Sequence, residues 1–216
     1  MTRMAEKIQR LEGLLSTTPP GTNCHNEFLR SIADWYQLMF CQTNDPSDIE
    51  ESLKYRRLSR DATHSGDTLK VKSRTSLYLT LNLAFKKTKK IGYLNELITV
   101  GYDIFEFTER SSQYTHFETV ARLVQSLFIR ERLLGRGPGE DSHEVVRLIP
   151  MVINNPYAHE PDRLRLSCQW AHAARSISHS TTLMAYKTVR RLRLRSQRIG
   201  SREWGSSWTL DNDCTQ

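Results

Sequence analysis

Two stretches of the chain share one plan: FLRSIADWYQLMFCQTNDPSDIEESL at residues 28–53 and SRTSLYLTLNLAFKKTKKIGYLNELI at residues 73–98. A shift of 45 residues aligns their apolar positions, so that Ile32 meets Leu77, Tyr36 meets Leu81, Phe40 meets Phe85, Ile49 meets Leu94 and Leu53 meets Ile98. Within each stretch most apolar residues recur every three or four positions, as on one face of a helix. Each stretch therefore predicts a helix, a polar loop (42–47 or 86–93) and a second helix.

The same plan extends along the rest of the chain. A third unit places Glu144 48 residues after Glu96, a fourth runs over 164–194, and the predicted helix 3–15 resembles the second half of an earlier unit. Residues 77–85 alternate as a strand would, but their alignment with a helix favours a helix. Pro150 is expected to kink or end the second helix of the third unit, because proline removes a helix hydrogen bond.

Helix pairs that recur every 40–47 residues are typical of an α-solenoid, in which stacked pairs bury the apolar stripe that one pair alone leaves exposed. We therefore predict an all-α fold, an α-α solenoid of about four helix pairs over residues 1–196. Residues 197–216, with Trp204 and Trp208, lack periodicity and are expected to form a disordered tail. A non-repetitive helical bundle is the alternative fold. Two uncapped ends would favour self-association.

The positive charge of the chain is confined to one segment. Lysine and arginine number 31 against 24 acidic residues, and residues 187–202 hold seven of the basic residues and no acid. Without this segment the charges balance, so no broad nucleic-acid surface is expected. The candidate basic contact patch consists of Lys187, Arg190, Arg191, Arg193, Arg195 and Arg198. It is interpreted as a solvated helix end, a phosphate-binding or nuclear-targeting patch, or a contact for an acidic partner.

The sequence nominates no catalytic, cofactor or metal site. Cys24-His25 with Cys41 fits no zinc spacing, and the histidines at 25, 64, 116 and 159 fall in predicted connectors. The Gly135–Gly139 run lacks the Gly-Lys-Ser/Thr ending of a phosphate loop, and His143-Glu144 lacks the partners of a zinc site. Glu51, Glu96 and Glu144 are expected in the first turns of helices, where acids favour the dipole. We expect neither an enzyme nor a cofactor.

Several segments resemble the degenerate tetratricopeptide (TPR) arrays that precede a CHAT domain, a caspase-like peptidase module, in proteins of mushroom-forming fungi. The similarity lies in Tyr93–Ile98, in the connector-like His159–Arg163 and Thr18–Gly21, and most specifically in Trp170–Arg175 with His179–Tyr186. It covers about residues 10–195 and includes no caspase-like His–Cys pair, so it implies no peptidase activity. Leu97 and Val145 stand where such repeats usually have alanine. The resemblance implies TPR-like helix pairs that bind proteins.

The predicted function is a non-catalytic protein-interaction scaffold, which binds a peptide or partner domain in a groove lined by the first helices of successive units. The alternatives are a basic-tailed nucleic-acid-binding helical protein and a small helical enzyme. Four scattered cysteines and a start without a signal-peptide pattern favour an intracellular protein with free thiols, in the cytoplasm or the nucleus. No apolar stretch approaches the roughly 20 residues that span a bilayer, so no membrane association is expected.

Overall fold

The structure is a computed structural model that describes residues 2–63, 67–108, 113–135, 140–154, 160–177 and 179–200. Within these ranges the chain forms helices and no strand, and residues 77–85 are helical as predicted. The helices are α1 (Thr2–Thr17), α2 (Asn23–Thr43), α3 (Pro46–Ala62), α4 (Asp67–Thr88), α5 (Ile91–Thr108), α6 (Gln113–Leu134), α7 (Glu140–Ile153), α8 (Glu160–Ile177) and α9 (His179–Gly200). The prediction of an all-α fold is confirmed.

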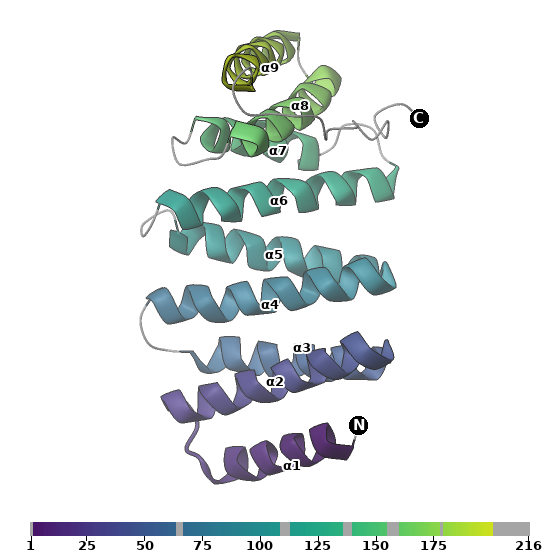
Figure 1. Cartoon of the computed structure of the whole chain (residues 1–216), viewed down its shortest axis with the longest axis vertical. Helices are drawn as coiled ribbons and strands as arrows, with labels where there is room; N and C mark the ends of the chain where they lie inside the picture. Colours follow the sequence, from purple (N-terminus) through teal and green to yellow (C-terminus); the bar gives the residue numbers. More distant parts are fainter. Residues whose placement is uncertain are drawn as a thin grey trace. The chain divides into compact units, whose positions relative to one another are not determined.

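The chain divides into two compact units, Met1–Arg136 and Gly137–Gln216. In the first unit α2 packs against α3 and α4 against α5, and each pair contacts the next through α3 with α4 and α5 with α6 (Figure 1). The helix α1 packs against α2, in the way that α3 packs against α4. These contacts are the nearest-neighbour contacts of a helical solenoid. The boundary expected at residue 196 stays a prediction; α9 continues to Gly200, and residues 201–216 lie outside the described part.

Most of the apolar positions that the 45-residue alignment paired belong to the core of the first unit. Ile32 and Leu77 are fully buried on the first helices, and Ile49 and Leu94 on the second helices. Phe40, Phe85, Leu53 and Ile98 are buried as well. Because burying one such side chain contributes about 1.5–3 kcal/mol, this repeated set stabilises each pair against its neighbours.

Short turns with one left-handed residue join the two helices of a pair. Asn44 and Lys89 adopt φ angles of 56° and 57°, and their amides donate to the carbonyl oxygens of Phe40 and Phe85, each at 2.8 Å. Asp45 caps α3, where its carboxylate accepts from the Ser47 amide at 3.0 Å, and Pro46 occupies the first turn. Both loops are shorter than predicted, because the second helices begin already at Pro46 and Ile91.

The early start of the second helices changes the place of three glutamates. Glu51, Glu96 and Glu144 lie in the second turn of α3, α5 and α7 rather than in the first, so the prediction of a first-turn role was wrong. A dipole effect falls off beyond the first turn. Each glutamate instead pairs with a basic side chain: Glu51 with Lys54 at 2.8 Å, Glu96 with Arg57 at 2.6 Å and Glu144 with Arg147 at 2.8 Å.

Four side-chain hydrogen bonds in the first unit join residues that are 43 positions apart. Two connect second helices: Tyr55 donates to Glu12, and Tyr93 donates to Glu50. Thr80 of α4 donates to Gln37 of α2 at 2.9 Å, and Lys87 donates to Asn44 at 3.2 Å. Each repeat is therefore tied to the preceding one at a constant separation along the chain.

The second unit contains α7, α8 and α9, which pack in sequence order. Its buried side chains include Leu148, Ile149, Leu166, Trp170 and Leu192. The helix α7 continues through Pro150 to Ile153, so the predicted break at this proline was wrong. Pro150 lies in the last turn, where its missing N–H removes one hydrogen bond near the helix end, and its own carbonyl accepts from Asn154 at 3.1 Å.

None of the described helices combines the length and the apolar character that crossing a membrane would need.

Candidate functional site

The helices α2 and α4, which are the first helices of the two pairs in unit one, and α6 expose equivalent rows of side chains. Fully buried Ile32, Leu77 and Leu123 mark the same position in each helix. These three residues lie on the side of each helix that faces the second helices. The row of residues six positions later points about 240° around the helix axis from them. That row is apolar and consists of Leu38, Leu83 and Ile129, of which Leu38 is 41% and Ile129 40% exposed. The row of Leu38, Leu83 and Ile129, together with exposed Leu79 on α4, is called the first-helix face below.

Hydrogen bonds between neighbouring first helices hold this face together. Gln37 of α2 accepts from Thr80 of α4, and the hydroxyl groups of Tyr78 on α4 and Ser126 on α6 lie 2.9 Å apart. Both tyrosine and serine are buried, and burial raises the pKa of Tyr78 to about 12. Side-chain hydrogen bonds between buried groups fix the mutual register of the helices, because an unmade bond there is costly.

The two ends of the first-helix face differ in charge. Glu27 and Glu118 lie toward the N-terminal ends of α2 and α6, and the row nine residues beyond the buried markers holds Cys41, Lys86 and Arg132. All three are exposed, and neither Lys86 nor Arg132 forms an ion pair within the described part of the chain. Cations also favour helix C-terminal ends for dipole reasons. The face therefore presents an apolar row beside a row with two unpaired cations.

A small hollow lies between α4, α5 and α6 in the first unit. It is lined by Thr75, Tyr78, Ile104, Glu118, Thr119 and Arg122. Arg122 and Glu118 pair across one helical turn at 3.2 Å, so the rim of the hollow carries both charges. Among the described residues that line it, the hollow contains no cluster of groups for catalysis.

Gly101 allows the three helices around this hollow to approach closely. A Cβ atom at Gly101 of α5 would lie 3.1 Å from Leu123 Cδ1 and 3.4 Å from Tyr78 Cε2. The shorter distance is tighter than ordinary van der Waals contact, so a larger residue would push α6 or α4 outward.

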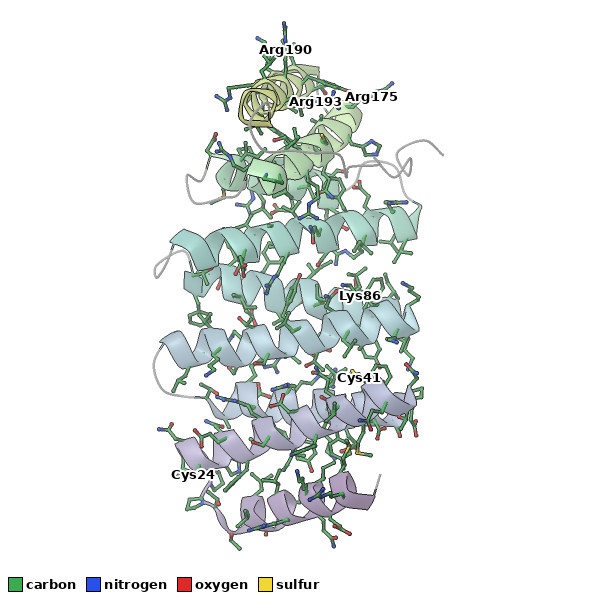
Figure 2. The ribbon with its side chains drawn as sticks, viewed as in Figure 1. Cys24, Cys41, Lys86, Arg175, Arg190 and Arg193 are labelled. Carbon is green, nitrogen blue, oxygen red and sulfur yellow. The ribbon has the colours of Figure 1, made fainter. Side chains whose placement is uncertain are left out.

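The predicted basic patch lies on α9 in the second unit. Lys187, Arg190, Arg191 and Arg193 are exposed there, and Figure 2 shows Arg190 and Arg193 on this helix. Arg195 and Arg198 belong to the same helix, but their side chains lie outside the described residues. The four described cations are carried by one element, so the patch is a helix surface, and its role as a contact stays a prediction.

The residues weighed as metal ligands are not brought together. Cys24 and Cys41 lie at opposite ends of α2 (Figure 2), and both are free and exposed. His25 lies beside Cys24 near the N-terminus of α2, and His143 is exposed on α7. Histidines 64 and 159 lie outside the described residues, as does the side chain of His116. No group of three possible ligands occurs in the part of the chain that the structure describes.

The glycine run 135–139 begins at the end of α6. Gly135 adopts a φ angle of 57°, which a glycine reaches without strain. Residues 136–139 lie outside the described ranges, and the boundary between the two units falls between residues 136 and 137.

Sequence reasoning did not identify the individual residues of the first-helix face. The 45-residue shift also aligns Leu38 with Leu83, but their apolar character does not distinguish them from core residues. The distinguishing signal is their angular offset from Ile32 and Leu77, since six residues turn a helix about 240° away from the buried side.

Comparisons with known proteins support the fold. No family model and no curated protein matches the chain. A solved structure described as "Podosopora anserina putative kinesin light chain nearly identical TPR-like repeats" is similar at a TM-score of 0.57 and 14% identity, over 91% of this chain and 90% of that chain. A point variant of that protein matches at a TM-score of 0.56, 13% identity and the same coverage. At this identity the likeness shows the fold alone, a TPR-like helical repeat solenoid.

Proposed function

We propose that the chain is a non-catalytic protein-interaction scaffold, which binds an extended segment of a partner protein across α2, α4 and α6. The observation that carries this proposal is the partly exposed apolar row of Leu38, Leu83 and Ile129 beside the unpaired cations Lys86 and Arg132. Exposed apolar side chains that recur at equivalent positions of successive repeats form a contiguous strip, and such strips mark interaction sites.

The chemistry of the face defines the segment that fits it. Leu38, Leu79 and Ile129 offer apolar contact for two or three aliphatic or aromatic side chains of the partner. Lys86 and Arg132 would pair with carboxylates that lie beside those side chains, which favours an apolar segment flanked by aspartate or glutamate. An apolar segment without acids would leave the two cations unpaired and is expected to bind less tightly.

The wider context of the chain is also a proposal. Cys24 and Cys41 are free and exposed, which supports a reducing intracellular setting such as the cytoplasm. An association with a CHAT module and a fungal source rest on the sequence similarity over about residues 10–195, which is most specific at residues 170–186. No ion pair or cavity of the described residues favours the nucleic-acid alternative over a protein partner.

The test is selection of peptides by the full chain from a phage-displayed random library, followed by affinity measurement by fluorescence anisotropy. The selected peptides should combine apolar and acidic residues. Leu38→Asp with Ile129→Asp should weaken their binding at least tenfold, and Lys86→Glu should weaken it about fivefold with a smaller salt dependence.

Matched controls separate the face from general effects. Leu58→Asp changes a leucine that is 46% exposed on α3, a second helix, and Arg10→Glu reverses an exposed charge on α1. Both should leave the affinity within twofold. Selected peptides that tolerate Leu38→Asp with Ile129→Asp, or that lose affinity equally with Leu58→Asp, would overturn the proposal.

A further inference from the structure

The outward surface of α9 carries two exposed leucines in one line. Ala185 and Leu192, seven residues apart, are buried, and α9 packs against α8. Leu183 and Leu194 are 52% and 51% exposed. They are 11 residues apart, which is about three helical turns, so they lie on the same line of the helix, opposite its buried side.

Unpaired cations surround the two leucines. Lys187 and Arg190 lie between them along the same line, and Arg191 and Arg193 lie on either flank; all four are exposed. None of the four forms an ion pair within the described residues, and α9 contains no acidic residue along its whole length. Exposed Arg175 near the end of α8 adds a further cation to this unit (Figure 2).

This arrangement differs from the cations of the first unit. There Arg57 is paired with Glu96 and Arg122 with Glu118, and each helix that carries an unpaired cation such as Lys86 or Arg132 also contains an acidic residue. On α9 like charges stand three and four residues apart, a spacing that destabilises a helix. A partner that supplies carboxylates would relieve this repulsion as well as form ion pairs.

We propose that the outward surface of α9 docks an acidic amphipathic helix of a partner protein. Apolar side chains of that helix pack on Leu183 and Leu194, and its glutamates and aspartates pair with Lys187, Arg190 and Arg191. The surface lies in the second unit and is independent of the first-helix face, so each proposal can fail alone.

The apolar residues favour a helix over other polyanions. A nucleic-acid backbone would match the cations but would place polar sugar and phosphate against Leu183 and Leu194. An acidic helix lying along α9 satisfies both the line of leucines and the cations beside it.

The probe is a 22-residue helical peptide of alanine, glutamate and leucine, with two leucines 11 residues apart and glutamates beside them. A control peptide carries glutamine in place of each glutamate. Binding to the full chain is measured by fluorescence anisotropy at low and high salt. The glutamate peptide should bind at least tenfold more tightly than the glutamine peptide, and this advantage should shrink as salt rises.

Variants of α9 then test both parts of the surface. Arg190→Glu with Arg191→Glu should weaken binding of the glutamate peptide at least tenfold, and Leu183→Ser with Leu194→Ser at least fivefold. Matched controls in the first unit are Arg3→Glu with Arg10→Glu, and Leu58→Ser with Leu133→Ser, all at exposed positions. These should change the affinity less than twofold. Circular dichroism confirms that each variant retains its helices.

Several results would overturn the proposal. One is equal affinity for the glutamate and glutamine peptides, and another is insensitivity to the α9 variants. A single-stranded 20-mer DNA or vesicles of anionic lipid that bind more tightly than the peptide, and lose affinity with the same variants, would assign the surface to a nucleic acid or a membrane. Peptide binding that appears only after deletion of residues 201–216, which include Asp211 and Asp213, would make that segment the occupant.

Discussion

The guanidinium group of Arg57 on α3 forms a bidentate ion pair with the carboxylate of Glu96 on α5. The Nε–Oε1 distance is 2.7 Å and the Nη2–Oε2 distance is 2.6 Å. The pair raises the pKa of Arg57, chiefly through the hydrogen bonds to Glu96. It connects the second helices of two successive repeats, so it acts on repeat stacking rather than on a single helix.

Replacement of Glu96 by glutamine should therefore weaken the contact between repeats. We expect Glu96→Gln to lower the free energy of unfolding by about 1 kcal/mol, since the pair is bidentate but partly exposed. The measurement is urea denaturation followed by circular dichroism. Glu106→Gln, at an exposed position of the same helix, should change stability by less than about 0.3 kcal/mol. Equal effects of the two changes would show that the pair contributes nothing specific.

Gly101 should be a position where size is limited by packing. Gly101→Val should lower the free energy of unfolding by about 1–3 kcal/mol, because the new side chain collides with Leu123 and Tyr78. Gly13→Val is the matched change, since Gly13 lies inside α1 with no atom within 4 Å of an added Cβ. It should leave stability within about 0.5 kcal/mol, as valine and glycine have similar helix propensities. A larger loss at Gly13 than at Gly101 would contradict this assignment.

Leu97 stands where the TPR repeats that this chain resembles usually have alanine, and its side chain packs within the core. It is 1% exposed, so Leu97→Ala should cost about 2–5 kcal/mol through lost burial and a cavity. Leu79→Ala removes the same atoms from a side chain that is 48% exposed and should cost less than about 1 kcal/mol. Thermal denaturation of both variants checks this, and a gain in stability with Leu97→Ala would show that alanine fits better.

Alkaline pH should destabilise the first unit through Tyr78. Burial raises its pKa to about 12 in the folded chain, against about 10 when unfolded. Between these values the unfolded chain binds fewer protons than the folded chain, so the free energy of unfolding falls as pH rises from 10 to 12. Below pH 10 the contribution of Tyr78 to stability is fully present. The contribution of this tyrosine is about 2–3 kcal/mol.

Tyr78→Phe isolates this titration from that of the lysines. The variant should lose about 1 kcal/mol at pH 7, because the hydrogen bond with Ser126 is gone, and should then depend less on pH above 10 than the unaltered chain. Tyr186→Phe, at a half-exposed ring, serves as the control. The measurement is the urea midpoint at each pH between 8 and 12. Parallel pH profiles for Tyr78→Phe and the unaltered chain would refute a role for Tyr78.

The helix pairs could be predicted from the sequence because the same apolar spacing occurs twice. Ile32 with Leu77 and Ile49 with Leu94 are core positions in the structure, and this agreement came from a repeat rather than from single helices. A repeated pattern averages out local exceptions, such as the strand-like alternation over residues 77–85, which tertiary packing overrides.

The helix starts were less predictable, and so were the roles that depend on them. Pro46 and Ile91 begin their helices earlier than the apolar pattern does, because the first residues after a short turn need no buried side chain. Glu96 was predicted to interact favourably with the dipole of its own helix, but it pairs with Arg57, which lies 39 residues earlier in the chain. Pro150 was expected to kink or end α7, but it lies in the last turn, so the helix is already near its end and continues only to Ile153.

The candidate interaction face was predicted only as a class of surface. Its apolar residues look like core residues in the sequence. In the structure Leu38 is exposed and Ile32 is buried because the two residues point to different sides of α2. Conversely, the basic segment 187–202 was visible at once, but the exposed Leu183 and Leu194 beside it were not distinguishable from the buried Leu192. Spacing separates the leucines of one helix into two faces, but which face is buried depends on how the repeats pack.

The two tyrosine–glutamate bonds that join residues 43 positions apart have a mechanical consequence. A stretching force applied to the ends of the first unit loads the Tyr55–Glu12 and Tyr93–Glu50 bonds in series. When one tie ruptures, a stretch of about one repeat is released, and 43 residues extend to about 150 Å. Pulled in this way, the molecule would lengthen in similar increments, because each rupture releases a length of chain that is set by the repeat.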